Sequence, residues 1–131
     1  MTLIDIRNMT KVYRMGESEF TALDNISLQI SAGEYAAIIG PSGSGKSTLM
    51  NMLGCLDVPT SGEYFLNGQD VSKMDETQLA GVRNKSIGFI FQRYNLMGRT
   101  SALRNVELPV RYAGLGASAR TERARSALQA V

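Results

Sequence analysis

The sequence predicts an α/β fold, and a strand, a turn and a helix in its first half carry this prediction. The segment Tyr35–Ile39 is short and continuously apolar, as expected for a parallel strand that is buried on both faces. The glycine-rich turn Gly40–Gly45 follows it directly. An amphipathic helix is predicted next, because apolar side chains recur at helical spacing at Leu49, Met52, Leu53 and Leu56.

The first third of the chain is predicted to form strands that precede this unit. Apolar residues from Leu3 onwards lead into Lys11–Tyr13, and a polar break follows at Arg14–Glu19. The segment Ile26–Ile30 then alternates apolar and polar residues, which is typical of a half-buried strand.

Beyond the glycine-rich turn, strands and helices alternate. Tyr64–Leu66 predicts a short strand, and Ile87–Phe91 predicts a second apolar strand. Between them, Asp75 followed three residues later by Gln78 indicates a capping box and a helix that runs to about Lys85. The last thirty residues predict two helices, with apolar stripes at Leu103, Val106 and Val110 and at Ala124, Ala127, Leu128 and Val131.

Composition narrows the class of protein. Fourteen basic and twelve acidic residues give a net charge of +2, which is too small to indicate nucleic-acid binding by itself. No run of 18 apolar residues and no signal peptide are visible. Histidine is absent, which excludes histidine-based catalysis and histidine metal ligands from these residues. The single cysteine, Cys55, is expected to be a small buried hydrophobe.

The segment Gly40–Ser47 matches the P-loop pattern G-x-x-x-x-G-K-[ST], also called Walker A. Its glycines let several backbone N–H groups point at one centre, at the positive end of a helix, where phosphates bind. Lys46 adds a charge for the β- and γ-phosphates, the Ser47 hydroxyl can ligate Mg²⁺, and Thr48 can bond near the α-phosphate.

Three observations narrow the class of P-loop protein. The guanine-reading pattern Asn-Lys-x-Asp is absent, since Asn84–Ile87 lacks the aspartate. Small-molecule kinases usually begin with the P-loop strand, whereas here 34 residues precede Tyr35. Finally, Gln92 ends an apolar segment 46 residues after Lys46.

With these residues in view, the whole chain resembles the N-terminal half of an ABC transporter ATPase subunit. The resemblance is carried by Tyr13, the loop Gly40–Thr48, Ser61-Gly62 and Phe89–Gln92. Four segments resemble one branch of this family, which includes the macrolide exporter and the lipoprotein-release ATPase: Met15–Phe20, Leu49–Asp57, Pro59–Gly62 and Asn105–Pro109. The implied fold is a truncated ABC-type nucleotide-binding domain of the P-loop NTPase class. It would comprise an antiparallel β-subdomain, a partial RecA-like core and the start of a helical subdomain.

The resemblance implies a site for ATP and Mg²⁺. Tyr13 would stack on the adenine, with Phe20 as the weaker alternative for the same pocket. Lys46 and Gln92 would act in catalysis, and Ser47 and Gln92 would contact the metal. The phosphate cradle would consist of Gly40, Pro41, Ser42, Gly43, Ser44, Gly45, Lys46, Ser47 and Thr48.

The resemblance also implies partners. The segment Gln92–Met97 would lie where a membrane permease docks. Two ATPase domains would form a homodimer. The protein would be cytoplasmic and peripheral on the inner face of the plasma membrane. No nucleic-acid partner is expected. The cluster Arg120, Arg123 and Arg125 is interpreted as a solvated helix face.

Four elements that hydrolysis requires in this family do not occur in the sequence: the Leu-Ser-Gly-Gly-Gln signature, the Walker B motif, the D-loop and the switch histidine. Residues 1–131 are therefore expected to be the N-terminal portion of a single ABC ATPase domain. Two alternatives remain open: an ABC ATPase that regulates a process such as division without transport, and a nucleotide-binding module that does not hydrolyse.

Overall fold

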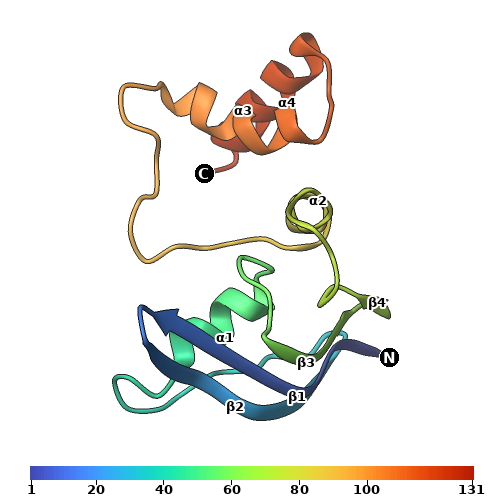
Figure 1. Ribbon diagram of the computed structural model, residues 1–131. Coiled ribbons are helices and arrows are strands. Elements are labelled where there is room, and N and C mark those ends of the chain that lie inside the picture. The colour runs from blue at the N-terminus through green and yellow to red at the C-terminus, as the bar shows by residue number, and fades with distance from the viewer. The chain divides into compact units, whose positions relative to one another are not determined.

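A computed structural model describes all 131 residues and divides them into two compact units, Met1–Val82 and Arg83–Val131 (Figure 1). The first unit holds the sheet and helix α1, and the second holds helices α3 and α4. Helix α2 begins in the first unit and ends in the second.

The first unit is built on an antiparallel sheet with strand order β2-β1-β3-β4. Strands β1 (Thr2–Met15) and β2 (Ser18–Ser31) form a long hairpin, which confirms the strands predicted for the first third of the chain. The predicted polar break Arg14–Glu19 contains the hairpin turn at Gly16 and Glu17, where Gly16 has a φ of +64°, but its outer residues continue the two strands. Strand β3 (Ser61–Leu66) pairs with β1, and the short β4 (Gln69–Asp70) pairs with β3.

Helix α1 (Lys46–Leu53) packs with the sheet to form the core of this unit. The predicted apolar stripe stops with the helix, and Leu56, beyond its end, is half exposed. The hydroxyl of the buried Tyr64 donates to the carbonyl of Leu53 at 2.9 Å, so β3 holds the C-terminal end of α1. The buried apolar side chains of this unit are Ile6, Met9, Leu23, Met52, Cys55, Tyr64, Leu66, Val71 and Leu79.

Helix α2 (Glu76–Ser86) begins at the predicted capping box. The Asp75 N–H donates to Gln78 Oε1 at 3.0 Å, and the Gln78 N–H donates to Asp75 Oδ1 at 2.8 Å. These reciprocal bonds satisfy two N–H groups that the helix itself leaves without partners. The helix ends one residue after the predicted Lys85.

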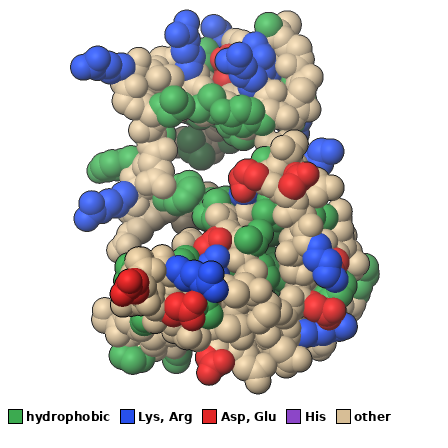
Figure 2. Space-filling model, in the orientation of Figure 1, with side chains coloured by type: hydrophobic (Ala, Val, Ile, Leu, Met, Phe, Trp, Pro, Cys, Tyr) green, Lys and Arg blue, Asp and Glu red, His purple; other side chains and the backbone are tan.

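The second unit contains α3 (Ala102–Tyr112) and α4 (Ala117–Gln129), which confirms the two predicted helices. Ser101 caps α3 by accepting the Arg104 N–H at 3.3 Å. The Thr121 hydroxyl donates to Glu107 at 2.7 Å and thereby joins α4 to α3. Basic side chains are prominent on the visible face of these helices (Figure 2).

The predicted parallel strands are wrong at the level of local structure. Neither Tyr35–Ile39 nor Ile87–Phe91 forms a strand, and both are extended segments outside any ladder. Tyr35, Ile39 and Ile90 are almost completely exposed, at 96%, 91% and 102%. The reason is physical: a strand requires a hydrogen-bonded neighbour, and a continuous apolar run only indicates what such a strand would bury.

Candidate functional site

The glycine-rich turn is held close to strand β2 and enters α1 through a left-handed backbone. Gly43 and Gly45 have φ values of +80° and +87°, which L side chains rarely adopt. A Cβ atom at Gly45 would also lie 2.6 Å from the carbonyl oxygen of Ala22 on β2. The loop can therefore follow this course only with glycine at position 45.

The N-terminus of α1 is open to an anion. Its N-cap residue is Gly45, no side chain caps it, and no acidic residue occurs in its first turn. The first N–H groups of a helix have no partner within the helix, and the helix dipole is positive at this end. This end of α1 therefore has the chemistry of a phosphate site.

Lys46 lies across the loop. Its ammonium donates to the carbonyl of Gly40 at 2.9 Å and to that of Pro41 at 2.5 Å, and it lies 3.4 Å from the Ser44 hydroxyl. The charge is thus held inside the loop, where it can exchange these neutral acceptors for phosphate oxygens.

A cavity of about 530 Å³ opens over the loop, within the size range of ligand pockets. Phe20, which is 54% exposed, brings an aromatic ring to this cavity from β2. The cavity is lined by Phe20, Ala22, Ser42, Gly43, Gly45, Lys46, Ser47 and Thr48.

Tyr13 lies directly opposite Phe20 in the β1–β2 register, but it does not line this cavity. Its ring is half-buried, and its hydroxyl donates to Asp57 Oδ2 at 3.0 Å and also interacts with the Thr48 hydroxyl. Burial and the neighbouring Asp57 carboxylate raise the pKa of Tyr13. Of the two predicted aromatics, Phe20 therefore lines the cavity over the loop, and Tyr13 is held through its hydroxyl by Asp57.

The residues fit a phosphate-bound Mg²⁺ better than a metal bound by protein alone. No group of three or more carboxylate, thiol or imidazole side chains is placed to hold a metal ion. The Ser47 hydroxyl is exposed beside Lys46, so one protein oxygen is available, and a triphosphate would have to supply others.

Gln92 lies in the second unit, at an exposed bend that follows the extended segment Ile87–Phe91. The phosphate loop belongs to the first unit. The contact predicted between Gln92 and a metal ion at that loop therefore remains a prediction.

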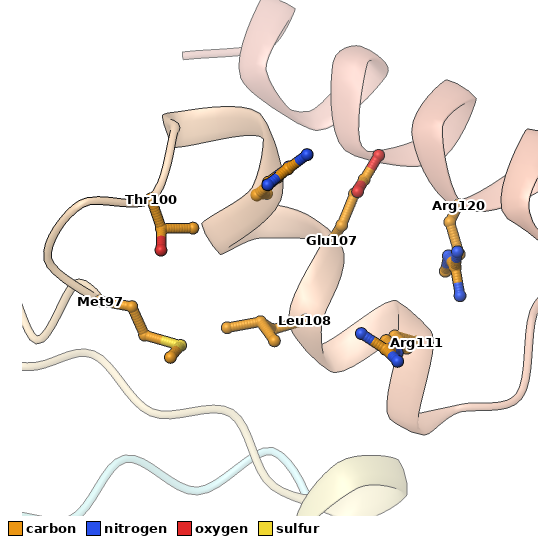
Figure 3. A pocket seen from close by; sticks show the side chains of 7 residues that line it. Met97, Thr100, Glu107, Leu108, Arg111 and Arg120 are labelled. Atoms are coloured by element: carbon orange, nitrogen blue, oxygen red, sulfur yellow. The ribbon is translucent and has the colours of Figure 1, made fainter.

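A second cavity, of about 270 Å³, lies within the second unit beside the residues that follow Gln92. Figure 3 shows Leu108 extending toward Met97, with Arg111 and Arg120 on the other side of Leu108. The Met97 N–H donates to the Asn105 side chain at 2.8 Å, which fixes this segment against α3. The cavity is lined by Met97, Thr100, Arg104, Glu107, Leu108, Arg111 and Arg120.

The sequence-based interpretation of the arginine cluster was partly wrong. Arg123 and Arg125 are exposed as expected, but Arg120 is half-buried and lines the second cavity. The sequence shows only that Arg120 lies near the start of α4. Its burial depends on residues of α3 that line the same cavity, and the sequence does not show which residues these are.

Comparison with known proteins decides the family. The family model described as ABC transporter matches residues 23–131. The chain belongs to the ABC transporter family. The resemblance inferred from the motifs is thereby confirmed, and the glycine-rich loop lies within the matched residues.

Named relatives place the chain among ABC transporter ATP-binding proteins. It is 52% identical over 129 residues to YknY of Bacillus subtilis, an ABC transporter ATP-binding protein, covering 98% of this chain and 56% of the relative. It is 54% identical over 126 residues to the macrolide export ATP-binding/permease protein MacB of Hyphomonas neptunium, covering 96% of this chain and 20% of the relative. The chain therefore spans about half of one relative and a fifth of the other.

Solved ABC cassettes have the same fold. The ATP-binding cassette MJ0796, solved as a dimer in a post-hydrolysis state bound to ADP and Pi, matches with a TM-score of 0.85 and 42% identity. The match covers 96% of this chain and 56% of that one. The predicted fold class, an ABC-type nucleotide-binding domain, is confirmed for these residues. No helix is long and apolar enough to span a membrane.

Proposed function

We propose that this chain binds ATP with Mg²⁺ and contributes to ATP hydrolysis that drives a membrane transporter. The observation that carries the proposal is the uncapped N-terminus of α1, which adjoins a glycine loop that contains Lys46, in a chain of the ABC transporter family. The loop Gly40–Thr48 would hold the phosphates, with its backbone N–H groups and the Lys46 ammonium as donors.

Each remaining site residue has a role in this proposal. Tyr13 stacks on the adenine, and Phe20, at the cavity wall, is the competing aromatic. Ser47 and Gln92 would hold Mg²⁺, which would neutralise charge on the phosphates. Lys46 stabilises the charge that develops during phosphoryl transfer, a reaction that depends mainly on positioning and electrostatics.

Turnover is proposed for the whole protein. The chain spans 56% of YknY, and the signature, Walker B, D-loop and switch elements are not among its residues. A general base and a partner subunit's signature loop would have to be supplied by other sequence. The 131 residues alone are therefore expected to bind nucleotide weakly and not to hydrolyse it.

The transporter role rests on the relatives and on the second unit. The MacB relatives are named ATP-binding/permease proteins, and the MJ0796 cassette was solved as a dimer. We propose that a permease, fused or separate, docks near Gln92–Met97, beside the cavity between α3 and α4. Two such ATPase domains would pair at the cytoplasmic face of the plasma membrane. No nucleic acid takes part.

The test is Lys46→Ala in the whole protein, with Lys85→Ala as the matched control because Lys85 is an exposed lysine in the last turn of α2. Equilibrium binding of a fluorescent ATP analogue and steady-state ATP hydrolysis are measured for both. Lys46→Ala should abolish turnover and greatly weaken binding, whereas the control should change neither.

Unchanged hydrolysis in Lys46→Ala would refute the P-loop assignment. Two further outcomes separate the alternatives. Lys46-dependent binding without any turnover would indicate a nucleotide-binding module, and turnover without a co-purifying permease would indicate a non-transport regulator.

A further inference from the structure

An ion pair contacts Tyr13 and joins strand β1 to the loop that follows α1. The Lys11 ammonium donates to Asp57 Oδ1 at 2.7 Å and to the Val58 carbonyl at 2.8 Å. The Lys11 side chain is only 11% exposed and that of Asp57 is 29% exposed. A lysine is buried to this extent only when it is paired, so the two residues are held together firmly.

The same pair holds Tyr13 at two points. The Tyr13 hydroxyl donates to Asp57 Oδ2 at 3.0 Å, and the Lys11 ammonium lies 5.0 Å from the centre of the Tyr13 ring. Lys11 and Tyr13 are two residues apart on β1, so their side chains share one face of the strand. The hydroxyl anchor and the cation over the ring together restrict both the direction and the tilt of the aromatic side chain.

Asp57 is itself fixed by the backbone. Its Oδ1 atom accepts the Val58 N–H at 2.8 Å as well as the Lys11 ammonium. Asp57 lies four residues beyond the C-terminal end of α1, and the N-terminal end of that helix adjoins the phosphate loop. The network therefore connects the predicted base-stacking ring to the helix that carries the phosphate donors.

We infer that Asp57 and Lys11 are positioning residues that hold the Tyr13 ring for stacking on the nucleotide base and set its spacing from the phosphate loop. This inference rests on the proposed function, in which Tyr13 stacks on adenine. A ring that is already ordered loses little freedom when the base binds. The pair therefore favours nucleotides over ligands that carry phosphates alone.

The discriminating measurement compares ATP with inorganic tripolyphosphate, which has the phosphate chain but no base. Dissociation constants for both, with Mg²⁺, are determined by calorimetry on the whole protein. Asp57→Asn keeps the shape of the side chain but removes its charge. It should weaken ATP binding by about two- to tenfold, the range expected for ordering one side chain, and leave tripolyphosphate binding unchanged.

Two further variants keep the test independent of folding defects. Lys11→Met combined with Asp57→Asn removes both charges and so avoids a buried unpaired lysine. Tyr13→Phe keeps the ring and loses only the hydroxyl anchor. Both should shift the ATP-to-tripolyphosphate ratio in the same direction as Asp57→Asn, and Asp57→Asn should have no added effect in a Tyr13→Ala background.

Asp70→Asn is the matched control, because Asp70 also pairs with a lysine, Lys73, at 3.0 Å, but lies on β4 away from Tyr13. It should change neither constant. Equal weakening of ATP and tripolyphosphate by Asp57→Asn would overturn the inference and leave Asp57 as a support of α1. An unchanged ratio in Tyr13→Ala would also overturn it. Lys46→Ala separates the two proposals. If this variant still binds ATP normally, the proposed function itself fails. If it loses ATP binding while Asp57→Asn weakens both ligands equally, only the positioning inference fails.

Discussion

The close approach of the phosphate loop to strand β2 can be tested with a matched pair of glycine substitutions. Gly43 and Gly45 have similar left-handed backbones, with φ values of +80° and +87°. A Cβ at Gly43 would meet nothing within 4 Å, whereas a Cβ at Gly45 would lie 2.6 Å from the Ala22 carbonyl oxygen and 3.2 Å from a Leu23 methyl group. The pair therefore separates backbone strain from steric conflict.

The expected magnitudes differ accordingly. A left-handed backbone costs an L residue roughly 1–2 kcal/mol, which is the whole effect expected for Gly43→Ala. Gly45→Ala must in addition push the loop away from β2, and overpacking of this kind typically costs about 1–3 kcal/mol. The free energy of unfolding should therefore fall by roughly 2–5 kcal/mol in Gly45→Ala.

Urea unfolding of the whole protein, followed by circular dichroism, gives the two free energies, and titration with ATP shows whether the displaced α1 still binds phosphate. Gly81→Ala in α2 is the reference, since its Cβ would meet nothing and its φ is not positive; it should be neutral or slightly stabilising. Equal destabilisation by Gly43→Ala and Gly45→Ala would refute the steric argument.

Three further predictions concern the base, the pH dependence and the chain alone. Stacking does not distinguish purines, so ATP and GTP should compete within about tenfold, or about 1.4 kcal/mol; Tyr13→Ala should weaken both, whereas a loss confined to Phe20→Ala would show that Phe20 is the stacking residue. Burial raises the pKa of Asp57, but hydrogen bonds from Lys11, the Val58 N–H and Tyr13 outweigh it, so this pKa lies below its ordinary value of 3.8. The stability that Asp57 contributes is therefore fully present above the unfolded pKa and is lost as pH falls through the lower, folded value, and Asp57→Asn should flatten the acid limb of a stability–pH curve measured by urea unfolding. Purified residues 1–131 should show no measurable ATPase activity and poor solubility, because large apolar side chains such as Tyr35, Ile39 and Ile90 are exposed; a monodisperse chain whose turnover is lost in Lys46→Ala would contradict this expectation.

Local features of this protein were determined by the sequence alone. The capping box joins Asp75 and Gln78, only three residues apart, so its geometry depends on little beyond the chain itself. The P-loop pattern likewise contains its own glycines, lysine and helix N-terminus within Gly40–Ser47. The family followed from the P-loop together with Tyr13, Ser61-Gly62 and Phe89–Gln92, all of which can be identified in the sequence.

Features that need a distant partner were decided by the tertiary structure. The apolar runs Tyr35–Ile39 and Ile87–Phe91 have the composition of buried strands, but a strand is formed by its neighbour, and neither run has one in the observed sheet. Asp57 lies 46 residues from Lys11, and no local pattern pairs the two. Only folding brings the Asp57 carboxylate to the buried Lys11 ammonium and to the Tyr13 hydroxyl. A buried charge needs an oppositely charged partner nearby in space, and that partner can be distant in sequence.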